Sequence, residues 1–126
     1  MWFNNNSNKE TVLFITEPLS EDDLITLDEE LEIYKELIEK FNDKRIIIKP
    51  HPRETKNYLE LFPNVEVLED SFPIELLELI GFTPDIVCSV CSTALLNFNH
   101  SEIYMYTGEI NSEKINLARN FLMNNL

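Results

Sequence analysis

The sequence predicts an α/β domain, a Rossmann-like three-layer arrangement around a mainly parallel sheet of about five strands. Short runs rich in β-branched and aromatic residues alternate five times with helical segments along the 126 residues. One of these runs, RIIIK at 45–49, is apolar enough to be covered on both faces, which is typical of parallel sheets. The length suits one domain with its own core, expected at 11–126 behind a flexible segment at 1–10.

The elements of the first half follow in order. TVLFIT at 11–16 is the first expected strand, and a loop containing Pro18 follows it. The next segment is a helix, because apolar side chains recur in steps of three and four along one face: Leu24, Leu27, Leu31, Tyr34, Ile38 and Phe41. After the strand at 45–49 we expect a short helix at 54–62 and a third strand at 65–69.

The second half continues the alternation. SFPIELLELIG at 71–81 is expected to be a helix, because Pro73 suits its first turn, Glu75 its positive end and Gly81 its stop. A fourth strand is expected at 85–90 and a fifth at 102–106, with a helix between them that begins at Ser92 or Thr93. Apolar residues at helical spacing from 111 onward predict a closing helix.

Composition excludes several classes of protein. The net charge of −13 argues against nucleic acid as a partner, since phosphate repels an acidic surface. No apolar run approaches the roughly 18 residues of a membrane span, and the N-terminus lacks the pattern of a signal peptide. Two cysteines are too few for a disulfide scaffold, so we expect a cytoplasmic protein, at most peripheral to the inner face of the membrane.

Positive charge is concentrated in one window. Residues 40–56 hold six basic and two acidic side chains, a local charge of +4 that leaves −17 for the rest of the chain. Lys40, Lys44 and Arg45 suit the end of a helix, where cations are favoured by the dipole. Lys49 and Arg53 are not explained in that way. A basic island in an acidic chain indicates a small anion as ligand.

The segment KPHPR at 49–53 ends the second expected strand, where ligands bind in parallel sheets. Pro50 and Pro52 stiffen this segment and present His51 at little ordering cost. An imidazole near neutral pH can donate to a phosphate oxygen, and Lys49 or Arg53 can supply countercharge. The alternative is that His51 is an ordinary loop histidine.

Polar residues follow the next two expected strands, so three loops are expected to meet on one rim of the sheet. Asp70, Ser71 and Glu75 follow the third strand, and Ser89, Ser92 and Thr93 end or follow the fourth. A helix beginning at Ser92 or Thr93 would offer backbone N–H groups and hydroxyls to an anion. The alternatives are an ordinary N-cap for the Ser-Thr pair and a favourable first-turn acid for Glu75, whose functional role would be to accept from sugar hydroxyls.

Cys88 and Cys91 form a C-x-x-C pair. A redox pair is one interpretation, and a zinc site completed by His51 and His100 is another. Because Cys88 falls inside the expected fourth strand, buried free cysteine is the favoured interpretation.

Three motifs in this order, KPHPRET, FPIELL and CSVCSTALL, resemble the nucleotide-binding half of bacterial sialyltransferases, in particular the lipooligosaccharide sialyltransferase family. VLFITEPLSED is similar to the start of that half, and the resemblance covers roughly residues 11–120. It implies the C-terminal Rossmann-like half of a GT-B glycosyltransferase that uses CMP-sialic acid and needs no metal or other cofactor. It also implies an exposed apolar face on the closing helix, since this segment crosses between the halves in the family.

The resemblance also implies roles for individual residues. His51 would act in catalysis by holding the phosphate of the departing CMP, which Ser92 and Thr93 would also bind. Glu75 would take the ribose hydroxyls, and backbone around Pro50 and Pro52 would contact cytosine. Lys49, Arg53 and Ser89 complete the expected nucleotide-binding set.

One departure from the family is large. The family's catalytic base lies in an acid-acid-Gly motif, whereas Gly81 and Gly108 here follow Leu-Ile and Tyr-Thr. The chain therefore resembles a fragment that is inactive alone and reaches its glycan acceptor through a missing N-terminal domain. The alternatives are a CDP-glycerol glycerophosphotransferase-like GT-B domain, a non-catalytic nucleotide-binding or regulatory module, and a structural partner domain. Homo-oligomerisation is left open.

Overall fold

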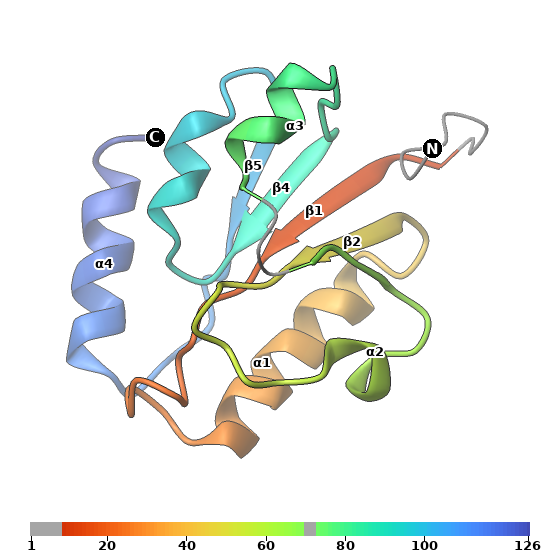
Figure 1. Cartoon of the computed structure of the whole chain (residues 1–126). Coiled ribbons are helices and arrows are strands. Elements are labelled where there is room, and N and C mark those ends of the chain that lie inside the picture. Colours follow the sequence, from red (N-terminus) through yellow and green to blue (C-terminus); the bar gives the residue numbers. More distant parts are fainter. Residues whose placement is uncertain (1–8, 70–72) are drawn as a thin grey trace.

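The computed structural model describes residues 9–69 and 73–126 and confirms the predicted α/β fold (Figure 1). Within these ranges one sheet has the order β3-β2-β1-β4-β5, and each neighbouring pair of strands is parallel. Its strands are β1 (Thr11–Ile15), β2 (Arg45–Lys49), β3 (Glu66–Val67), β4 (Ile86–Ser89) and β5 (Glu102–Met105). The chain winds outward from β1 in both directions, so the strand order reverses between β1 and β4, where α/β sheets bind ligands.

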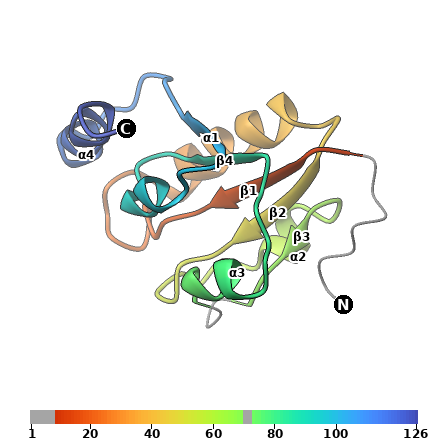
Figure 2. The same cartoon turned by 90° about the horizontal axis from the view of Figure 1, so that it is seen from above.

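Helices cover both faces of the sheet, as Figures 1 and 2 show. On one side lie α1 (Leu27–Lys40) and α2 (Tyr58–Leu61), and on the other lie α3 (Glu75–Leu79) and the 3-10 helix η1 (Thr93–Asn97). Alternate side chains of β1 enter the two hydrophobic clusters, Val12 and Phe14 on the α1 side and Leu13 and Ile15 on the other. This is the expected three-layer arrangement.

The last helix, α4 (Glu113–Met123), lies beside these layers and contacts both clusters. Its Ile115 packs with the α1 side and its Leu122 with the α3 side. Leu117 and Phe121 remain 61% and 53% exposed, so the helix also presents the expected apolar face to solvent.

The predicted face of α1 was wrong in part. Leu27 is exposed at the start of the helix, whereas Glu30, Ile33, Tyr34 and Leu37 are buried. The helix is therefore rotated relative to the expected stripe. Glu30 lies on the core-facing side because Lys56 neutralises its charge there. A pattern of hydrophobic residues does not reveal such an ion pair.

Several other expected elements are shorter in the structure. The third strand has two residues instead of five, and the helix expected after Ser92 is a 3-10 helix of five residues. The α3 helix is followed by Gly81 with φ +76°, which confirms the predicted stop. Most of the expected flexible segment, residues 1–8, lies outside the described residues, as do Asp70 and Ser71.

No helix in the described ranges is long and apolar enough to cross a membrane.

Candidate functional site

A cavity of about 340 Å³ lies at the carboxyl ends of the central strands, on the expected rim. It is lined by residues from the ends of β1 and β2, from the start of α3 and from η1: Ile15, Thr16, Glu17, Lys49, Pro50, His51, Pro52, Pro73, Ile74, Glu75, Ser92, Ala94 and Asn97. Six of the sequence-predicted residues are therefore brought together: Lys49, Pro50, His51, Pro52, Glu75 and Ser92.

The His-Pro segment is held in place by its own backbone. The His51 N–H donates to Glu54 Oε2 at 2.7 Å, and the Glu54 N–H donates back to the His51 carbonyl at 3.0 Å. The Arg53 N–H donates to His51 Nδ1 at 3.1 Å. In the neutral ring the proton must then be on Nε2, which makes Nε2 a hydrogen-bond donor for a ligand.

Ser92 follows β4, whereas His51 follows β2. Ser92 is almost fully buried. It is the N-cap of η1, and its Oγ accepts from the Ala94 N–H at 3.2 Å. Its own N–H donates to Ser89 Oγ, also at 3.2 Å. Because η1 is so short, it has little helix dipole. This loop offers an anion the Ser92 hydroxyl and backbone N–H groups instead.

The remaining predicted residues lie outside the described cavity lining. Ser89 is fully buried behind Ser92 and positions it, and Thr93 is exposed at the start of η1. Arg53 forms a paired contact with Asp22, at 2.6 and 3.1 Å, from the loop after β1. Their roles toward a ligand stay predictions.

Sequence reasoning missed Glu17, which follows β1 directly and lines the cavity with His51 and Ser92. Tyr34 fixes its backbone, since the hydroxyl accepts from the Glu17 N–H at 3.2 Å and donates to the Glu17 carbonyl at 3.0 Å. Burial raises the pKa of Glu17, although the Ser92 side chain and the charge of His51 act to lower it. The signal was available, because a strand followed at once by Thr-Glu-Pro places polar residues on the same rim.

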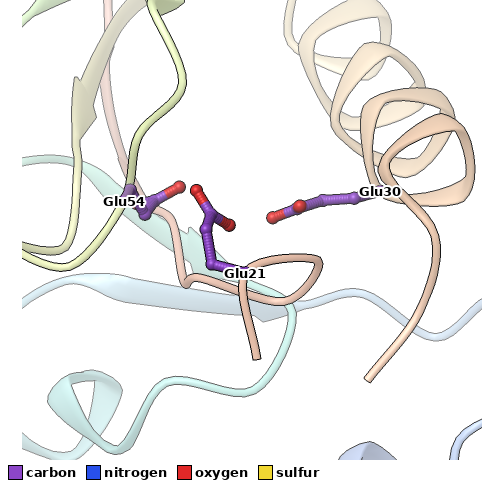
Figure 3. A group of neighbouring side chains, drawn as sticks. All are labelled: Glu21, Glu30 and Glu54. Carbon is purple, nitrogen blue, oxygen red and sulfur yellow. The ribbon is translucent and has the colours of Figure 1, made fainter. Parts of the chain in front are cut away.

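Behind the cavity three carboxylates converge on one another, from the loop after β1, from α1 and from the loop after β2 (Figure 3). The ammonium of Lys56 lies 2.5 Å from Glu21, 3.2 Å from Glu30 and 3.0 Å from Glu54. Glu30 Oε2 accepts no hydrogen bond within the described chain and relies on this ionic contact. The three carboxylates need a positive charge between them, which a metal ion could provide. Here the Lys56 ammonium provides it.

Glu54 connects this cluster, the Lys56 cluster, to the cavity. One oxygen accepts from the Thr16 hydroxyl at 2.6 Å and from the His51 N–H, and the other accepts from the Tyr58 hydroxyl. Its side chain is 1% exposed, so these bonds are shielded from water. The buried network thus fixes the position of the His51 loop relative to β1.

Both cysteines are free, with Cys88 buried and Cys91 half-buried. Burial raises the pKa of both thiols, that of Cys91 to about 12. Cys88 thus agrees with the favoured interpretation of a buried free cysteine, and the raised pKa values disfavour a reactive thiolate at either position.

Two larger hollows, of about 1030 and 830 Å³, lie along α1. The described residues that line these two hollows include no histidine, and glutamates are frequent in both linings. They suit an anionic ligand less well than the cavity at the strand ends does.

Three comparisons with known proteins bear on this geometry. A family model described as Alpha-2,8-polysialyltransferase (POLYST) matches residues 3–102. An uncharacterized protein of Haemophilus influenzae is 36% identical over 101 residues, which cover 80% of this chain and 33% of that protein. The structure of an α/β-galactoside α2,3-sialyltransferase from Photobacterium phosphoreum, a luminous marine bacterium, matches with a TM-score of 0.63 at 18% identity, over 94% of this chain and 35% of that one.

The chain therefore shares the Rossmann-like α/β fold of the part of that structure it matches. The chain belongs to the alpha-2,8-polysialyltransferase family. This confirms, at the level of sialyltransferases, the class that the motifs resembled. The chain spans about a third of the length of the two proteins it resembles.

Proposed function

We propose that this chain is the nucleotide-binding part of a sialyltransferase and binds the CMP group of CMP-sialic acid at the strand ends. The observation that carries the proposal is the convergence of His51, Glu75 and Ser92 on one cavity where the strand order reverses. A fixed imidazole donor and a buried hydroxyl suit a phosphate, and a carboxylate in the same cavity suits a pair of sugar hydroxyls.

Each predicted residue then has a role. His51 Nε2–H and the Ser92 hydroxyl bind the phosphate, with Thr93 beside them, and Glu75 accepts from the ribose. Backbone at Pro50 and Pro52 contacts cytosine. Lys49 and Arg53 lower the cost of bringing an anion into an acidic protein, and Ser89 holds Ser92. No metal or other cofactor is required.

Turnover is proposed to need a second domain that carries the catalytic base and binds the glycan acceptor. The motifs point to a cell-surface glycan such as lipooligosaccharide, reached from the inner face of the membrane. The exposed Leu117 and Phe121 of α4 offer a surface for such a domain. Alone, the chain is expected to bind nucleotide weakly and to transfer no sialic acid.

The test is a calorimetric titration with CMP, with CDP-glycerol and UMP as competitors. His51→Ala is expected to abolish binding, because it removes the phosphate donor. The matched control is His100→Ala, which removes the other histidine, an exposed residue outside the cavity lining, and should bind CMP as the natural chain does.

A preference for CDP-glycerol over CMP would replace the proposal with the glycerophosphotransferase class. Equal binding by the His51→Ala chain would remove His51 from the site. Absence of CMP binding at millimolar concentration, by a chain shown to be folded, would refute the proposal for this chain.

A further inference from the structure

The described cavity contains an anionic side chain where an anionic ligand is proposed to bind. Glu17 lines the same cavity as His51 and Ser92, and the Ser92 side chain acts to lower the pKa of its carboxyl, as a hydroxyl near a carboxylate does. Ser92 Oγ already accepts from the Ala94 N–H, so its single proton is what it has left to donate. A carboxylate oxygen at Glu17 and a phosphate oxygen would therefore compete for one hydroxyl proton.

The backbone that carries the Glu17 side chain is fixed beside the cavity. Tyr34, which is fully buried, holds the Glu17 backbone through both its N–H and its carbonyl, and Pro18 follows directly. Edge-to-face contact with Phe14 of β1, at 5.1 Å between ring centroids, fixes Tyr34 in turn. The base of the Glu17 side chain is therefore held beside the proposed phosphate position.

The charges around Glu17 come from several elements. His51 and Arg53, after β2, attract the carboxylate, whereas Glu54, in the same loop, repels it. Glu75 adds a further carboxylate on the α3 side of the cavity. A second negative charge on a bound ligand would increase this repulsion, because a partly buried cavity screens charges less than bulk water does.

We propose that Glu17 is a specificity-determining residue that weakens the binding of a dianionic phosphate relative to a monoanionic one. The inference rests on the proposed function. In CMP-sialic acid the phosphate is a diester with one negative charge, whereas the product CMP is a monoester whose second proton has a pKa of about 6. At the phosphate, Glu17 thus disfavours the dianionic monoester of the product more than the monoanionic diester of the donor. It takes back the Ser92 hydroxyl as CMP leaves, which promotes product release.

The test measures the affinity of the chain for three probes at pH 8. They are CMP, the methyl ester of the CMP phosphate, and cytidine, whose 5′ groups carry two, one and no negative charges. For Glu17→Gln we expect CMP to bind about tenfold tighter, the methyl ester about threefold tighter and cytidine without change. Glu17→Asp retains the charge and is expected to keep the natural order of preference. Glu32→Gln removes one charge from an exposed site on α1 that does not line this cavity, and it controls for net charge.

If Glu17 had only a structural role, Glu17→Gln would change the affinities for all three probes by the same factor. A change in affinity that grows with the charge of the probe would therefore not arise from such a role. In a Ser92→Ala chain the additional Glu17→Gln change is expected to tighten CMP binding less, because the contested hydroxyl is gone. The inference is overturned if Glu17→Gln leaves the ratio of CMP to cytidine affinity unchanged, or if Glu32→Gln shifts it equally. Failure of the natural chain to bind CMP would instead refute the proposed function, and this inference with it.

Discussion

Replacing Lys56 by methionine removes the ammonium that lies among the Glu21, Glu30 and Glu54 carboxylates, at 2.5, 3.2 and 3.0 Å. The Lys56 side chain is 5% exposed, and those of Glu30 and Glu54 are 0% and 1% exposed, so water cannot take over the solvation. Removing one partner of a buried ion pair costs about 3–5 kcal/mol. Because domains of this size are typically stable by about 5–15 kcal/mol, the Lys56→Met chain should lose a large part of its stability.

Urea unfolding at pH 7, followed by far-UV circular dichroism, measures this loss. For an m-value of about 2 kcal/mol/M, the midpoint is expected to fall by about 1.5–2.5 M. Lys35→Met, at an exposed position of α1, is the matched control and should change stability by less than about 0.5 kcal/mol. A loss below about 1 kcal/mol for Lys56→Met would refute the view that this ammonium holds the cluster together.

The same comparison has a defined pH dependence. Burial acts to raise the pKa of Glu21, but hydrogen bonds from Lys56 and from the Thr55 N–H lower it to about 2, against 4.5 in the unfolded chain. A folded-state pKa below the unfolded one gives stability that is present above pH 4.5 and is lost as the pH falls toward 2. The Lys56→Met chain lacks most of this contribution. Its deficit relative to the natural chain should therefore shrink between pH 5 and pH 2, and a constant deficit would contradict the assignment.

Three further predictions concern local structure. Thr26→Ala removes the N-cap of α1 and its capping box with Glu29, and urea unfolding should show a loss of about 1 kcal/mol; no loss would contradict the cap. Gly81→Ala places a side chain at φ +76° in open space, so strain alone should cost about 1–2 kcal/mol, and a stabilised chain would exclude that conformation. Because burial raises the pKa of the half-buried Cys91 thiol to about 12, iodoacetamide at pH 8 should label it far more slowly in the folded than in the unfolded chain, and equal rates would contradict the raised pKa.

The sheet could be predicted because its signals are local. Runs such as RIIIK, which forms β2 from Arg45 to Lys49, are apolar and β-branched, and they lie between segments of clear helical period. The third strand was overestimated, since β3 has only the two residues Glu66 and Val67 in register with β2 in the described chain. Register at a sheet edge depends on a partner far away in the sequence, and composition does not contain that information.

The site could be predicted in part for a similar reason. Pro-His-Pro and Ser-Thr after strands identified two of the loops that meet at the cavity, because strand ends in a parallel sheet share one edge. Glu17 and the Lys56 cluster were missed. Their importance comes from contacts between residues distant in the sequence, such as Glu30 of α1 with Lys56, and an acidic helix pattern reads as a solvated face.

The most direct test of the nucleotide site is a map of amide chemical-shift changes on titration with CMP. We expect the largest changes at His51, Glu75 and Ser92, and smaller ones at Glu17, all around the cavity at the strand ends. Changes confined to the hollow lined by Leu24, Leu27 and Leu61 would place the ligand elsewhere and contradict the proposal. The same pattern in the His100→Ala chain, together with its loss in the His51→Ala chain, would establish the site.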